Sequence, residues 1–304
     1  MNNQMSNQQN KNYGLNLALE KQQQSEKDWV FGATSPICLA EGMPETEREK
    51  YLPKGEVQQG VEDMADCASR GPINILETKF NYLIQNKIIS VGSIKFLKDN
   101  GYADKGGRVE FSDAFIAINS GTTKQGNSMK APLESIRLMG LVPKKLLPLE
   151  KWMTWDDYHK PERITSELKT LGLEFLNHFG INYEKVYEKN LTTLLNRDLS
   201  NLAGFAWSDP VGGEYPRVDF PPNHVFMGLR NPRTYIFDNY IDLVDEDFIK
   251  KLAPDYDFVD YGYRIIISEK KKEEKSEKEL SFWQKKLNHF IADLLAEIKE
   301  IFNF

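Results

Sequence analysis

The sequence of 304 residues predicts an α+β domain in which helices come first and short strands follow. Apolar residues recur at helical spacing after Cys67, and short β-type segments lie between Gly, Pro and Asn residues in the second half of the chain. Hydrophobic residues make up 40% and aromatic residues 12% of the chain, which is enough for a substantial core. This order of elements predicts two halves, one helical and one antiparallel β, that meet at a cleft.

Three segments carry the helical pattern. In the first, the apolar positions after Cys67 are Ile73, Leu76, Phe80, Leu83 and Ile84. A second helix is expected over 132–141, where Gly140 ends it, and a third over about 161–179, ending at Gly180.

The expected strands are short and lie beyond these helices. They cover Leu202 to Trp207, Val225 to Leu229, Thr234 to Phe237 and Tyr263 to Ile267.

The two ends of the chain differ from its middle. Residues 1–27 are rich in Asn, Gln, Lys and Ser, which predicts a disordered arm before a domain at 28–268. Ten of the eleven residues 269–279 are charged, so 269–281 is expected to be a linker. Residues 282–304 have apolar positions at three-and-four spacing and predict an amphipathic helix for self-association or for binding within a larger assembly.

Charge and composition narrow the class of function. A net charge of −6 disfavours a nucleic-acid binder, so peptides or proteins are the expected partners. No secretory signal and no apolar run of 18 residues is visible, and a cytoplasmic or virion-associated protein is expected. The four histidines show no ligand-pair spacing with a cysteine, so neither a metal nor another cofactor is expected. A Cys38–Cys67 disulfide remains an alternative to a reactive thiol.

Cys67 is the first candidate for chemistry. A polar loop containing Gly60 delivers it to the start of the first predicted helix. The positive end of the helix dipole favours a thiolate there and should lower the pKa of the thiol. The structural alternative is a small core cysteine.

The run from Cys67 to Glu77 resembles the nucleophile helix of papain-like cysteine peptidases, including a glutamate ten residues after the cysteine. The resemblance implies that a glutamine shortly before the nucleophile donates to the oxyanion, a role that falls to Gln59 or Gln58. The chain lacks the family's Cys-Gly-Ser-Cys-Trp signature and has Ala68 after the cysteine. It therefore resembles divergent members from bacteriophages and uncultivated bacteria.

The segment from Asn119 to Ser128 resembles the Gly-rich substrate-binding strand of the same family. The resemblance implies that Gly126 and Asn127 bind the backbone of a peptide substrate. Glycine permits such a close approach, and an extended peptide can pair in β fashion. An ordinary loop is the alternative.

A predicted hairpin carries the remaining candidates. His224 begins one strand and Asp238 follows the next, so the hairpin should bring the two side chains together. By resemblance, Asp238 takes the place of the family's orienting Asn, and Tyr240 that of the aromatic residue beside it.

The sequence therefore predicts a cysteine endopeptidase with a Cys67, His224 and Asp238 triad. An inactive papain-like module of a larger, for example virion, assembly is the alternative. Transglutaminase-like or acyltransferase chemistry uses the same three residue types and stays open.

Overall fold

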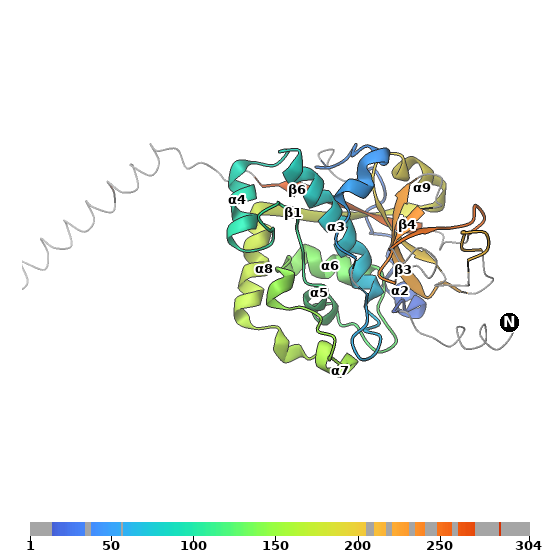
Figure 1. The fold of residues 1–304 in the computed structure, drawn as a ribbon, viewed down its shortest axis with the longest axis horizontal. Helices are drawn as coiled ribbons and strands as arrows, with labels where there is room; N and C mark the ends of the chain where they lie inside the picture. Colours follow the sequence, from blue (N-terminus) through green and yellow to red (C-terminus); the bar gives the residue numbers. More distant parts are fainter. Residues whose placement is uncertain are drawn as a thin grey trace, which may run out of the picture. The chain divides into compact units, whose positions relative to one another are not determined.

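The computed structural model describes residues 14–33, 38–55, 57–204, 210–216, 221–230, 235–240, 248–256, 261–270 and 286. The chain divides into two compact units, Met1–Glu269 and Lys270–Phe304. The first unit is α+β, which confirms the predicted class (Figure 1). The amphipathic helix expected at 282–304 lies outside the described residues apart from Lys286. No helix in the described ranges is long and apolar enough to cross a bilayer.

The helical half contains the three predicted helical segments together with helices that the sequence analysis did not predict. The α-helices are α2 (Leu17–Gln23), α3 (Cys67–Gln85), α4 (Val91–Asp99), α5 (Asp113–Asn119), α6 (Lys130–Met139), α7 (Trp155–Tyr158), α8 (Ser166–His178) and α9 (Glu188–Leu195). Three 3-10 helices are η1 (Glu45–Tyr51), η2 (Lys144–Leu146) and η3 (Pro161–Arg163). The predicted helices after Cys67 and before Gly140 are confirmed, and Gly140 ends α6 at a φ of 72°. The third is divided into η3 and α8, because Thr165 is extended and caps a new helix.

The strands form one six-stranded antiparallel sheet in the order β1-β6-β2-β3-β4-β5. They are β1 (Phe179–Tyr187), β2 (Ser200–Gly204), β3 (His224–Arg230), β4 (Tyr235–Phe237), β5 (Ile249–Lys251) and β6 (Tyr261–Glu269). Each of the four predicted segments overlaps one of these strands, namely β2, β3, β4 or β6. The sequence pattern missed β5, which has three residues, and β1, which follows α8 directly without a turn signal.

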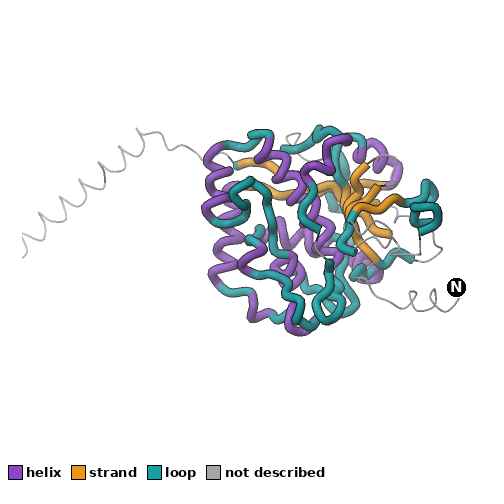
Figure 2. The backbone as a smooth tube through the Cα atoms, viewed as in Figure 1, coloured by secondary structure: helices purple, strands orange, loops and turns teal. Residues whose placement is uncertain are grey.

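Helix α3 joins the two halves. Figure 2 shows most helices on one side of the first unit and the short strands on the other, and α3 packs against β3. Gly71 makes the close approach possible, because a Cβ there would lie 2.9 Å from Val225 Cγ1 and would overlap the side chain of Asn201. The start of α3 is therefore held against the start of β3.

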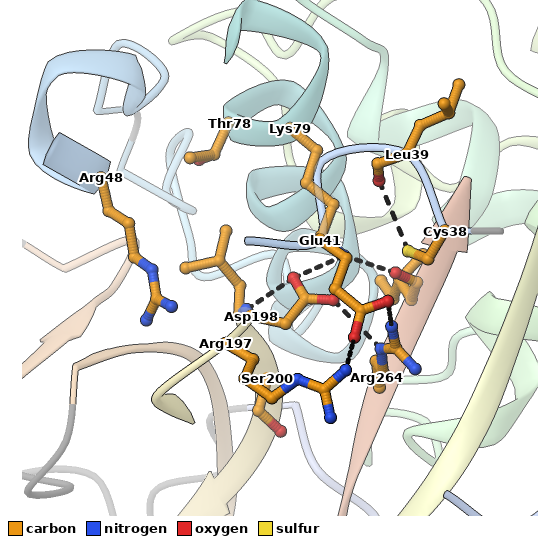
Figure 3. Close-up of polar contacts among 12 residues, drawn as sticks. Cys38, Leu39, Glu41, Arg48, Thr78, Lys79, Arg197, Asp198, Ser200 and Arg264 are labelled. Atoms are coloured by element: carbon orange, nitrogen blue, oxygen red, sulfur yellow. Dashed lines mark hydrogen bonds and ion pairs between the residues drawn. The ribbon is translucent and has the colours of Figure 1, made fainter. Parts of the chain in front are cut away.

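A buried ionic cluster also fixes α3 to the sheet (Figure 3). Lys79 Nζ lies 2.7 Å from Asp198 Oδ1 and donates to the backbone oxygen of Ile265 at 2.6 Å. Arg264 of β6 donates through Nε to Asp198 Oδ2 at 3.1 Å. Because Lys79 and Asp198 are almost fully buried, removing one partner would leave an uncompensated charge in the core.

The N-terminal segment is structured over part of the predicted arm. The composition of residues 1–27 predicted disorder, but from Gly14 onward the segment is described and includes α2. The difference arises because Leu15 and Glu20 are 5% and 1% exposed and make long-range contacts that a composition rule cannot contain. Residues 1–13 lie outside the described residues.

Candidate functional site

Cys67 is the first residue of α3 and is 1% exposed. The preceding Asp66 does not cap the helix with its side chain. Its carboxylate instead accepts from Arg70 Nε at 2.8 Å and from the Tyr158 hydroxyl at 2.7 Å. Both cysteines are free, so the alternative of a Cys38–Cys67 disulfide is wrong.

His224 and Asp238 form a buried pair. His224 Nε2 and Asp238 Oδ1 are 2.7 Å apart, and both side chains are fully buried. The register of β3 and β4, in which Met227 opposes Phe237, places these residues at the same end of the two strands. The ring of Tyr240 lies over the imidazole at a centroid distance of 5.2 Å. The first residue of α3 therefore carries the expected thiol, and the first residue of β3 carries the imidazole. The residue after β4 carries the carboxylate.

The sulfur of Cys67 lies at this same end of β3. The backbone N–H of Val225, the residue after His224, forms a hydrogen bond with the thiol. The carboxylate of Asp238 also acts electrostatically on the thiol, as do Asp63 and Asp66. The structure therefore brings Cys67 into the region of His224 and Asp238, 157 residues further along the chain.

The pKa of Cys67 differs from the expectation. Burial raises it well above its ordinary value, and the neighbouring carboxylates raise it further, whereas the Val225 N–H lowers it. The prediction of a lowered pKa from the helix dipole is therefore wrong for this covered state. The physical reason is that desolvation of a fully buried thiolate outweighs the partial charge at a helix start.

The pKa of Asp238 is shifted in the opposite direction, below its ordinary value. Burial by itself would raise its pKa, but the charge of Lys250 and the contact with His224 lower it overall. Lys250 Nζ lies 2.8 Å from Asp238 Oδ2 and also donates to the backbone oxygen of Tyr240. Asp238 is consequently held as a carboxylate with one oxygen on the imidazole and the other on an ammonium group.

The two candidate glutamines lie in different surroundings. Gln58 is fully buried, whereas the side chain of Gln59 is exposed. Gln58 Nε2 donates to Asp63 Oδ1 at 3.0 Å, and Asp63 Oδ2 accepts from the hydroxyl of Tyr240. Gln58 rather than Gln59 is therefore tied to the residues around Cys67.

The N-terminal segment runs directly over the thiol. A Cβ on Gly14 would lie 3.0 Å from Cys67 Sγ. On one side, Asn127 N–H donates to Gly14 O at 2.9 Å and Asn16 N–H donates to Asn127 O at 2.8 Å. On the other side, Leu15 N–H donates to the backbone oxygen of Asn223 at 3.2 Å. Residues 14–16 thus span the site from the loop before α6 to the residue before His224.

The backbone of residues 14–16 occupies the place expected for a substrate. Gly126 and Asn127 were predicted to bind an extended peptide, and Leu15 forms a parallel bridge with Asn127. Gly126 has a φ of 82°, and a Cβ there would overlap the backbone of Gly14. The loop can therefore bind an extended backbone in β fashion, and the chain itself supplies that backbone here.

Glu20 anchors this segment. Its Oε2 accepts from Met129 N–H at 2.6 Å, at the start of α6, where a negative charge is favoured. Its Oε1 accepts from the hydroxyls of Tyr261 and Tyr263 at 2.7 and 3.1 Å.

Sequence reasoning missed Glu20, Asp63 and Lys250. No local motif marks them, because Glu20 contacts Tyr261, Asp63 contacts Tyr240 and Lys250 contacts Asp238 only in the folded chain. Among the described residues, no cluster of three or more His, Cys, Asp or Glu side chains is arranged to hold a metal ion.

The chain is similar to several solved structures of cysteine proteases. No family model matches the chain, and no curated protein matches it. The cysteine protease Amb a 11 of ragweed pollen, in its proform, shares 12% identity over 79% of this chain and 69% of its own, with a TM-score of 0.46. Xylellain, a cysteine protease from Xylella fastidiosa, shares 12% sequence identity, and the match covers 82% of this chain and 93% of xylellain, with a TM-score of 0.43. A cysteine protease of Carica candamarcensis in complex with E-64 shares 10% sequence identity, and the match covers 72% of this chain and 95% of that protease, with a TM-score of 0.44. At these levels of identity and overlap, the function has to be judged from the site itself.

Proposed function

We propose that residues 28–268 form a papain-like cysteine endopeptidase, whose site is covered by residues 14–16 in the described state. The proposal is supported by the buried His224–Asp238 pair and by the electrostatic influence of Asp238 on the Cys67 thiol, which lies at the same end of β3. A thiol, an imidazole and a carboxylate that orients it are the groups that nucleophilic acyl transfer requires.

In the proposed reaction, His224 takes the proton of Cys67 and the thiolate attacks the carbonyl carbon of a peptide bond. The Cys67 backbone N–H and the amide of Gln58 or Gln59 stabilise the oxyanion that forms. His224 then donates its proton to the leaving amine, and the thioester remains. Water, deprotonated by His224, hydrolyses the thioester and restores the thiol. Asp238 holds the imidazole through Nε2 in both protonation states.

A substrate would bind where residues 14–16 now lie. The N–H and C=O groups of Asn127 and the C=O of Asn223 already bind an extended backbone. The segment must therefore leave before a peptide enters. Its departure would also hydrate the thiol, which removes the main cause of the raised pKa of Cys67.

A second candidate is a non-catalytic papain-like module of a larger assembly. It is favoured by the covered, fully buried thiol, whose raised pKa keeps it protonated. The two functions differ in whether the thiol ever becomes reactive.

Hydrolysis of a mixed peptide library by the full chain tests the proposal. Wild type and Glu20→Ala, which loosens the cover, are compared with Cys67→Ala and His224→Ala in each background. We expect peptide cleavage in the Glu20→Ala protein and none after either substitution at the triad. If Glu20→Ala exposes Cys67 to alkylation and still cleaves no peptide, the non-catalytic module is the better description.

A further inference from the structure

Lys250 is a buried lysine that contacts the orienting carboxylate directly. It lies in β5, where it opposes Ile236 of β4, and its side chain is 2% exposed. Asp238 and His224 are fully buried as well. A charged lysine in such a place needs a compensating charge, and the 2.8 Å contact with Asp238 Oδ2 supplies it.

The contact between Lys250 and Asp238 changes the net charge beside the His224 ring. A buried carboxylate 2.7 Å from an imidazole nitrogen strongly favours the imidazolium form. Lys250 cancels that charge, because the Asp238–Lys250 pair has a net charge of zero. The carboxylate then orients the ring by its hydrogen bond while its charge is offset by the ammonium group.

From this geometry we infer that Lys250 is a positioning residue, which sets the proton balance between Cys67 and His224 by neutralising Asp238. The inference rests on the proposed function, since only a reacting thiol and imidazole give that balance a catalytic meaning. It assigns to β5 a part in the site that acts on the imidazole through Asp238.

Other charged and titratable groups face the same site. They come from the loop before α3, from α3 itself, from the residues after β4 and from the segment after β5: Asp63, Asp66, Cys67, Tyr240 and Tyr256. The carboxylate of Asp63 also favours positive charge nearby, whereas that of Asp66 is paired with the buried Arg70 of α3 at 2.8 Å. Lys250 opposes the effect of Asp63 through direct contact with the group that holds the imidazole.

The competing role is structural. Lys250 Nζ also donates to the backbone oxygen of Tyr240, so the lysine ties β5 to the residues after β4. A purely structural tie would change stability when removed, but the protonation of His224 would not respond to the sign of the charge at position 250.

Titration of the His224 ring by 15N NMR, in full-length protein with labelled histidine, separates the two roles without requiring activity. His224→Gln identifies the signal, and the other three histidines serve as internal references. We expect Lys250→Met to move the titration midpoint of His224 upward by about 1 to 3 pH units, because the carboxylate is then uncompensated. Lys250→Arg, which keeps the charge, should stay near the wild type.

Asp238→Asn and Asp238→Asn/Lys250→Met provide an independent comparison if Lys250→Met does not fold. The single variant leaves an uncompensated lysine, so His224 should titrate at lower pH than in the double variant, which carries neither charge. Equal midpoints within this pair, or between Lys250→Met and wild type, would overturn the inference. Because the titration needs no substrate, its result is independent of whether the protein proves to be a peptidase.

Discussion

The substitution Glu20→Ala should expose Cys67 without unfolding the first unit. Glu20 holds the covering segment by accepting hydrogen bonds from Met129 N–H at 2.6 Å and from the hydroxyls of Tyr261 and Tyr263 at 2.7 and 3.1 Å. Hydrogen bonds to a charged group contribute about 1.5–3 kcal/mol each. When the segment leaves, hydrogen bonds to water replace part of this free energy. We therefore expect Glu20→Ala to destabilise the closed segment by about 3 kcal/mol, which is a factor of about 150 in the opening equilibrium.

The assay is alkylation by iodoacetamide, followed by peptide mapping. Cys38, which is half-buried, provides an internal reference for reagent and pH. We expect the labelling rate of Cys67 to rise about 100-fold in Glu20→Ala, in line with the opening equilibrium. The rate at Cys38 should stay the same.

Glu26→Ala is the matched control, because Glu26 lies in the same segment but is exposed. It should leave both labelling rates unchanged. If Glu20→Ala retains its circular dichroism spectrum and Cys67 still labels at the wild-type rate, residues 14–16 are not what limits access to the thiol.

Two further predictions concern α3 and its first residue. Gly71→Ala should destabilise the protein by about 1–3 kcal/mol in urea unfolding, because its Cβ would crowd Val225 and Asn201, and a more stable variant would contradict the close packing of α3 on β3. Gly92→Ala, also helical but with no atom nearer than 3.8 Å, should gain about 0.5–1 kcal/mol. In the wild type, Cys67 should be alkylated much more slowly than Cys38 at each pH, since its buried thiol has a raised pKa and the reagent reaches it only when the covering segment opens. Labelling that is already complete near neutral pH would show that the thiol is not desolvated in solution.

The sequence predicted the elements that carry the site. The apolar spacing after Cys67 gave α3, Gly140 gave the end of α6, and the residues on either side of the turn gave the β3–β4 hairpin. These features depend on local periodicity and on glycine or turn chemistry, which are present in short windows of sequence. Strand β5 has the sequence Ile-Lys-Lys, with a single apolar residue and none of the aromatic residues that marked the equally short β4.

What the sequence determined by itself is the helix that begins at Cys67 and the hairpin whose same end bears His224 and Asp238. The tertiary structure alone decided which groups surround them. It buried Gln58 instead of Gln59, placed Lys250 on Asp238, and laid Gly14 across the thiol through contacts made by Glu20. It also reversed the expected direction of the pKa of Cys67. The physical reason is that desolvation and ion pairing depend on which distant side chains share a volume, and periodicity along the chain carries no information about that.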